Sequence, residues 1–225
     1  MIRYMAMPTT VQPLWDALQQ EVIGIHAYWI NYRQLFGKSK ERIDLLNDCA
    51  GEFFFIIQDA LLTDVQLSLC RLADPAQTSG RANATLDRLL NEIAALNIPQ
   101  LTGDLIKCFQ RYRDCCQSIK LRRNKELAHA DLGALLKRYG SPAGSVPIPG
   151  PSRQEIEDAL ASLREFMNAI DVHFTGSPMA YEHFLSRNDG ESLVWVLKQG
   201  VRYGELSEAG ELPFDDLKKL THYDA

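Results

Sequence analysis

Long apolar runs are missing from this sequence. The most apolar stretch, FFFII at residues 53–57, is far shorter than the roughly 20 residues that a membrane-spanning helix needs. The N-terminus, MIRYMAMPTT, lacks the apolar core of a signal peptide. The five cysteines are odd in number and show no CxxC spacing, which is typical of reduced, mostly buried thiols. We therefore expect a cytoplasmic protein that does not associate with a membrane.

The common motifs for binding nucleotides and metals are also missing. The sequence contains neither GxxxxGK[ST] nor GxGxxG, whose glycines let backbone amides approach a phosphate. It has no HExxH, and its five histidines are dispersed, so a metal site would need distant residues to converge. The adjacent carboxylates of Asp215 and Asp216 are interpreted as a charge bias at a helix N-terminus. We expect no cofactor and no metal.

An excess of positive charge is lacking as well. The chain has 24 Lys and Arg residues against 29 Asp and Glu residues, a formal net charge of −5. This balance argues against a protein that coats nucleic acid over its whole surface, because such binding depends on neutralising phosphates. It leaves room for one local basic patch.

What the sequence has is helical periodicity. Apolar residues recur in alternating steps of four and three, which predicts a long helix with one buried face: Val11, Trp15, Leu18, Val22, Ile25, Trp29, Tyr32 and Phe36. A second helix is predicted from a broader stripe: Ile43, Leu46, Ala50, Phe53, Phe54, Ile57, Leu61, Val65, Leu69 and Leu72. The short polar turn at residues 37–42 predicts that the two helices form an antiparallel pair.

Further helices follow along the chain. A loop is expected at QTSGRAN, residues 77–83, followed by a short leucine-rich helix at residues 86–96 and a longer one at residues 101–119. Residues 141–151 hold four prolines and two glycines, which predicts a loop. SRQE at residues 152–155 has the capping-box pattern that opens a helix.

Beyond Gly176 the periodicity weakens. Residues 193–197 fit either one more helix or a strand, and no sustained alternation of period two occurs elsewhere. We therefore predict an all-α fold, a bundle of five or six helices over residues 1–176. Residues 177–225 are expected to form a small appendage packed on that bundle.

The stretch LRRNKELAHAD at residues 121–131 gathers basic residues, an Asn and a His. On a straight α-helix, Arg123 and His129 would differ by about 240° and would not share a face. They can converge if the helix breaks between them, where Asn124 is a good cap residue, or if a two-fold dimer brings both copies together. Without such convergence, the stretch is a charged helix face.

The segment RNKELAH, residues 123–129, resembles the signature of the HEPN superfamily, an Arg followed by Asn, His or Asp and then by a His. The extension AHAD at residues 128–131 resembles the branch found in abortive-infection proteins. SLCRLADPAQTSGRANATLDRLL at residues 68–90 resembles the same branch, because a helix ending in an RL-x-D turn precedes a short leucine-rich helix. The resemblance covers about residues 10–175.

This resemblance implies an HEPN-like helical bundle that dimerises, with the Arg and His motifs of both copies lining one cleft. It implies a metal-independent endoribonuclease of a prokaryotic toxin or phage-defence system, giving 2′,3′-cyclic phosphate and 5′-hydroxyl ends. His129 would be the general acid/base, and Arg123 would stabilise charge on the phosphoryl oxygens. Asn124 would orient the side chain of either Arg123 or His129 by hydrogen bonding.

Several alternatives stay open. Arg122 also falls within the spacing of the motif, so either arginine can be the motif residue. Lys120, Arg122 and Lys125 are candidate RNA-binding residues, because they supply positive potential on an acidic chain. Some HEPN domains do not cleave RNA, so the second hypothesis is an inactive module that dimerises or binds a nucleotide or partner. Candidate partners are RNA, a second copy of the chain and an antitoxin protein.

Overall fold

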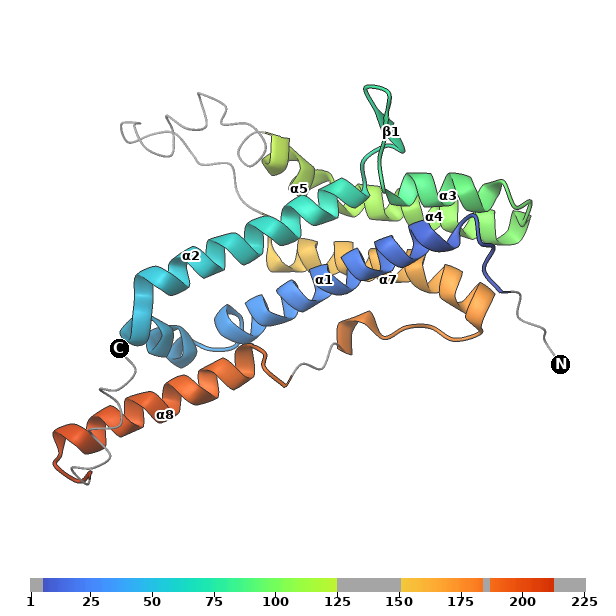
Figure 1. Ribbon diagram of the computed structural model, residues 1–225. Helices are drawn as coiled ribbons and strands as arrows, with labels where there is room; N and C mark the ends of the chain where they lie inside the picture. The colour runs from blue at the N-terminus through green and yellow to red at the C-terminus, as the bar shows by residue number, and fades with distance from the viewer. Residues whose placement is uncertain (1–5, 125–150, 184–186, 213–225) are drawn as a thin grey trace, which may run out of the picture. The chain divides into compact units, whose positions relative to one another are not determined.

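The computed structural model describes residues 6–124, 151–183 and 187–212 of the chain (Figure 1). These residues form seven α-helices, α1 (Gln12–Phe36), α2 (Lys40–Leu72), α3 (Leu86–Ala94), α4 (Pro99–Cys115), α5 (Gln117–Arg122), α7 (Arg153–Thr175) and α8 (Gly190–Glu208). A 3-10 turn, η2 (Tyr181–His183), precedes α8. The all-α prediction is therefore confirmed. The proline-rich loop expected at residues 141–151 lies almost wholly outside the described residues.

The contacts divide the chain into two compact units. Unit 1 comprises residues 1–29 and 61–184, and unit 2 comprises residues 30–60 and 185–225. Helices α1 and α2 each begin in one unit and end in the other. The boundary expected at residues 176–177 stays a prediction.

The core of unit 1 is built by α4, which packs against α7 and α3. Phe109 of α4 meets Phe166 of α7 edge to face, with ring centroids 6.3 Å apart. The predicted capping box opens α7, because the Ser152 hydroxyl accepts from the Glu155 amide while the Glu155 carboxylate accepts from the Ser152 amide. Gly176 ends α7 with φ 81°, a left-handed conformation that favours glycine.

The stripe predicted for α1 is confirmed, because every one of its eight apolar residues from Val11 to Phe36 is buried. The stripe predicted for α2 is only partly right. Ala50 has non-helical backbone angles, φ −166° and ψ 64°, and kinks the helix. After the kink, Phe54 is buried while Phe53 is 56% exposed. A kink changes the helical phase, so counting the stripe through it placed Phe53 on the buried side although Phe54, Val65, Leu69 and Leu72 were placed correctly.

The segment expected to be a loop at residues 77–83 contains a β-hairpin. Strands β1 (Gln77–Thr78) and β2 (Arg81–Ala82) pair antiparallel. The two-residue turn between them has φ 49° at Ser79 and 77° at Gly80, which suits the twist of a hairpin. The strands are too short for an alternating pattern, so period two could not be detected in the sequence.

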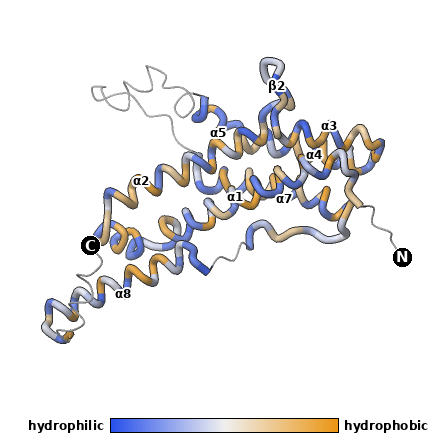
Figure 2. The backbone as a smooth tube through the Cα atoms, in the orientation of Figure 1, coloured by the Kyte–Doolittle hydropathy of each residue, from blue (hydrophilic) through white to orange (hydrophobic). Residues whose placement is uncertain are grey.

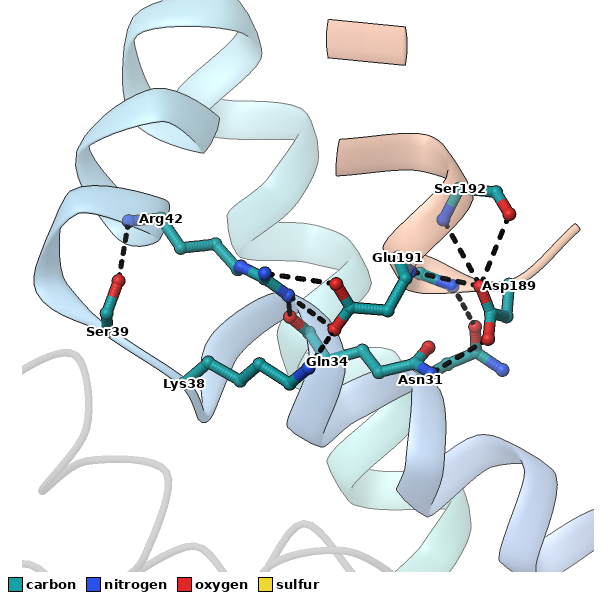
Figure 3. A network of polar contacts seen from close by, with 9 residues as sticks. Asn31, Gln34, Lys38, Ser39, Arg42, Asp189, Glu191 and Ser192 are labelled. Atoms are coloured by element: carbon teal, nitrogen blue, oxygen red, sulfur yellow. Dashed lines mark hydrogen bonds and ion pairs between the residues drawn. The ribbon is translucent and has the colours of Figure 1, made fainter. Parts of the chain in front are cut away.

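Within unit 2, hydrogen bonds attach the N-terminus of α8 to the end of α1 (Figure 3). The Asp189 carboxylate caps α8 by accepting from the amides of Glu191 and Ser192, and it also accepts from the Gln34 side chain at 2.8 Å. The Gly190 amide donates to the Asn31 side chain at 2.8 Å. A Cβ atom on Gly190 would lie 3.1 Å from the Gln34 and Leu35 side chains, so a larger residue here would require those side chains to shift by a few tenths of an ångström.

An ion-pair network completes this attachment (Figure 3). Both terminal nitrogens of Arg42 donate to the Glu191 carboxylate, at 2.8 and 3.1 Å, and Lys38 also pairs with it. The Gln34 carbonyl accepts from Arg42 as well. Hydrogen bonding to Arg42 lowers the pKa of Glu191 to about 2. The network joins the end of α1, the start of α2 and the first turn of α8, and residues 193–197 are helical rather than a strand.

Among the described residues, helix α2 has the length and the apolar composition that a membrane-spanning helix needs. In its most apolar stretch of 18 residues, 33% is buried inside the protein. Val65, Leu69 and Cys70 in the second half of α2 are fully buried in the protein. Core helices pass the same test, so the expectation of no membrane association stays a prediction.

His26 of unit 1 was not assigned a function from the sequence, and it is buried. Its Nδ1 donates to the Val22 carbonyl at 2.8 Å, and its Nε2 lies 3.2 Å from Arg164, which can only donate. This arrangement requires the neutral ring. Burial lowers the pKa of His26 below the ordinary 6.5, and the Arg164 charge lowers it further, against opposing effects of the Val22 carbonyl, Glu182 and Glu157.

Unit 1 is therefore expected to lose stability in mild acid. Below about pH 6.5 the unfolded His26 binds a proton that the folded ring does not, so the free energy of unfolding falls with pH until it passes the folded pKa. We expect the difference in urea midpoint between pH 8 and pH 5.5 to shrink in a His26→Asn variant, which keeps a donor for the Val22 carbonyl. An equal pH dependence in both proteins would contradict this prediction.

Candidate functional site

The basic stretch begins on α5, a short helix that continues the direction of the chain after α4. Cys116 separates the two helices with φ −83° and ψ −1°. Arg123 follows α5 with helical backbone angles, and residues 123–124 form a wider π-helical turn. Such turns often occur at functional sites. Within the described residues the helix is interrupted at Cys116, and residues 125–129, where a break was expected, lie outside them.

The guanidinium of Arg123 is bound by the carboxylate of Asp74, which follows the end of α2. Its Nη1 donates to both oxygens of Asp74, at 3.1 and 2.8 Å. The two side chains are 16% and 28% exposed, so the pair is only partly screened by water. The Lys120 ammonium lies 3.8 Å from the same carboxylate. Asp74 thus contacts two of the basic residues from the turn that follows α2.

Asn124 also contacts Arg123. The Asn124 side-chain oxygen accepts from Arg123 Nε at 3.1 Å. Together with the bonds to Asp74, this contact restrains the plane of the guanidinium, whose donors have a fixed fork geometry. This contact does not test the catalytic role predicted for Asn124, which stays a prediction.

Arg122 is held in another way. Its Nη1 donates to the side-chain oxygen of Gln66 at 3.3 Å. Gln66 is buried on α2 and donates in turn to the Leu62 carbonyl at 3.0 Å. The two neighbouring arginines therefore contact α2 at different points, and Arg123 is the one that contacts the carboxylate of Asp74.

A buried layer supports the end of α2 beneath these residues. The Tyr112 hydroxyl donates to the Leu69 carbonyl at 2.6 Å, which satisfies one of the last carbonyls of the helix. Burial raises the pKa of the Cys70 thiol to about 11 and that of Cys116 to about 12. Both thiols are protonated at neutral pH, so they are packing residues rather than nucleophiles.

The site has a chemistry suited to phosphate. Lys120, Arg122 and Arg123 place three positive charges on one short segment, and Asp74 supplies one negative charge against them. The net positive potential can bind a phosphodiester, and arginine matches the geometry of its oxygens. Within the described residues, no group of three or more His, Cys, Asp and Glu side chains could hold a metal ion.

Two predicted residues, Lys125 and His129, lie outside the described residues. The roles assigned to these residues and to Lys120, Arg122, Arg123 and Asn124 stay predictions.

Asp74 was not among the residues predicted from the sequence, although it contacts Arg123. It stands 49 positions before Arg123, and carboxylates are common in the chain, so spacing alone cannot identify such a pair. A signal was present in the RL-x-D turn at residues 71–74. The aspartate of that turn is the residue that binds Arg123.

Comparison with known families matches residues 9–193 to the AbiU2 family of HEPN domains. Comparisons with curated proteins and with solved structures give no significant match. The matched region includes all helices from α1 to α7, the Asp74–Arg123 pair and the first turn of α8. This chain belongs to the AbiU2 family of the HEPN superfamily, a family of abortive infection in phage defence.

Proposed function

We propose that this protein is a metal-independent endoribonuclease of phage defence that acts through Arg123, Asn124 and His129. In the proposed reaction the RNA 2′-oxygen attacks the adjacent phosphorus while the bond to the 5′-oxygen breaks. His129 transfers the proton as general acid/base, since histidine titrates near neutral pH. The products are a 2′,3′-cyclic phosphate and a 5′-hydroxyl.

The observation that carries this proposal is the restraint of Arg123. Its Nη1 and Nε are bound by Asp74 and Asn124, and within the described residues its Nη2 makes no hydrogen bond. With Nη1 and Nε bound in this way, the guanidinium is held in one orientation, and the N–H donors of Nη2 can meet phosphoryl oxygens without losing further side-chain entropy. Arg123 would thereby stabilise the charge that develops on phosphorus oxygens during attack.

The neighbouring charges would grip the RNA backbone. Lys120, Arg122 and Lys125 are proposed to contact phosphates, which position RNA without selecting its sequence. We also propose that the enzyme acts as a homodimer in the cytoplasm, with the motifs of both copies in one cleft, and that an antitoxin protein restrains it.

A second candidate function is an inactive module that dimerises or binds a nucleotide or partner protein. The ion pair between Arg123 and Asp74 favours this alternative, because a carboxylate that neutralises the guanidinium is also what a purely structural arginine would need. The two candidates differ in whether RNA is cleaved.

The deciding experiment is cleavage of total cellular RNA by the purified protein in the presence of EDTA. We expect fragments with 2′,3′-cyclic phosphate ends, and we expect none from His129→Ala or Arg123→Ala variants with unchanged circular dichroism. Cleavage that survives in both variants would assign the activity to another site or a contaminant. Complete absence of cleavage would favour the inactive module.

Asp74 offers a separate test of how Arg123 meets RNA. In a His129→Ala background, which prevents cleavage, we expect Asp74→Asn to tighten binding of an RNA oligonucleotide by about threefold to fivefold at low salt. Asparagine keeps an acceptor for Arg123 and removes the competing charge. Fluorescence anisotropy at two salt concentrations measures the effect, which should shrink as salt screens the charges. Weaker binding would instead show that the Asp74 charge is needed to position Arg123.

A further inference from the structure

One face of α2 in unit 2 is apolar and exposed. After the kink at Ala50, residues 52, 55, 56 and 59 follow the spacing i, i+3, i+4 and i+7, so they share one side of the helix. Phe55 is 69% exposed and Ile56 is 63% exposed. Glu52 and Asp59, also exposed, flank them at either end. We call these four residues the acidic-apolar face.

The acidic-apolar face is also hollowed. Gly51, Glu52, Phe55 and Ile56 line a shallow open groove at the start of the helix segment. A Cβ atom on Gly51 would meet nothing closer than the Asn47 side chain at 3.8 Å, so the backbone does not require glycine there. The missing side chain leaves room for an apolar group from outside.

The opposite side of this helix segment packs into unit 2. Phe54 is buried, and the aromatic ring of the exposed Phe53 lies edge to face against it, with centroids 5.4 Å apart. The run at residues 53–57 is therefore not a continuous core segment, although all five residues are hydrophobic. Along α2 as a whole, hydrophobic and hydrophilic residues are interspersed (Figure 2). Two large apolar side chains on one exposed face are typical of an interaction surface rather than of scattered surface residues.

The charged residues along this part of α2 are of one sign. Between Arg42 and Arg71 the sequence contains no Lys or Arg, and its acidic residues there are Asp44, Asp48, Glu52, Asp59 and Asp64. A surface of this kind attracts a partner that combines apolar anchors with positive charge.

We propose that the acidic-apolar face docks an amphipathic helix of a partner protein, with apolar side chains over Phe55 and Ile56 and Lys or Arg residues near Glu52 and Asp59. Such helices bind grooves through anchors spaced i, i+3, i+4 and i+7. A second copy of the chain is a poor occupant, because a two-fold contact between identical faces would place the carboxylates of Glu52 and Asp59 against those of the other copy, and like charges repel. RNA and anionic membranes are repelled by the same charges. The inference does not rest on the ribonuclease activity.

The test uses two designed helical peptides of about 18 residues with identical leucine anchors, one flanked by lysine and one by glutamate. We expect the full-length protein to bind the lysine peptide at least about tenfold more tightly, measured by fluorescence anisotropy. Phe55→Ser removes an apolar contact and Glu52→Lys reverses a charge, so each should abolish the tighter binding of the lysine peptide. Both positions are exposed, so folding should be unaffected. Val172→Ser, which changes an exposed apolar residue of α7 in unit 1, is the matched control.

Equal binding of both peptides, or binding that the two face variants leave unchanged, would overturn the proposal. Sedimentation of the peptide-free protein addresses self-association: a dimer lost in Phe55→Ser would assign the face to a second copy. Flotation with vesicles of phosphatidylcholine and phosphatidylserine addresses the membrane, and binding lost in the same variant would assign the face to lipid.

Discussion

Replacing Arg123 with alanine is expected to lower the rate of RNA cleavage by about 10² to 10³ fold, the usual loss when one group that stabilises transition-state charge is removed. In the proposed mechanism Arg123 is the group that Asp74 and Asn124 restrain, so the loss should appear mainly in kcat. Single-turnover cleavage of a defined RNA, once a cleaved site has been mapped, measures the chemical step directly.

The matched control for this prediction is Arg122→Ala. Arg122 is the neighbouring residue and also fits the motif spacing, but it contacts Gln66 instead of Asp74. We expect Arg122→Ala to raise KM severalfold and to change kcat little, since a phosphate contact contributes to binding rather than to the chemical step. If Arg122→Ala has the larger effect on kcat, then Arg122 is the motif arginine and the role proposed for Arg123 is wrong.

The second large effect concerns the core of unit 1. Phe166 is fully buried on α7 against Phe109 of α4, and these are the helices that pack most extensively. Phe166→Ala removes the ring and leaves a cavity, so we expect a loss of about 3–5 kcal/mol in the free energy of unfolding. Stabilities of about 5–15 kcal/mol are usual for a domain, so much of the folded population could be lost. Urea unfolding followed by far-UV circular dichroism measures the change.

Val172→Ala is the control on the same helix. Val172 is 47% exposed, so its truncation should change the free energy of unfolding by less than about 0.5 kcal/mol. Comparable losses in the two variants would mean that the Phe109–Phe166 contact does not anchor the core. A small loss in Phe166→Ala alone would mean that neighbouring side chains fill the cavity.

The helix predictions succeeded where a single unbroken helix packs along one face. The apolar residues of α1 repeat without interruption and all of them are buried. The capping box at Ser152 was also predictable, because its two hydrogen bonds join residues three positions apart. Both features depend on interactions within one or a few turns, which the order of residues specifies directly.

The predictions for α2 and for residues 77–83 were only partly right, for local reasons that the residue pattern does not display. Nothing in the residue types around Ala50 marks a kink, and after it Phe54 is buried as predicted while Phe53 is exposed. The hairpin strands have two residues each, too few for any periodicity. Of the run at residues 53–57, the predicted stripe included Phe53, which is exposed, and left out Phe55 and Ile56, which are exposed as well.

The sequence by itself determined the all-α class, the faces of the regular helices and the segment at residues 120–129 that resembles the HEPN motif, because helical periodicity and short motifs are local properties of the chain. Only the tertiary structure decided that Asp74 binds Arg123 while Gln66 binds Arg122. It also decided that Phe55 and Ile56 face outward on α2. These outcomes depend on contacts between distant residues and on the phase of a kinked helix, and neither is encoded in spacing along the chain.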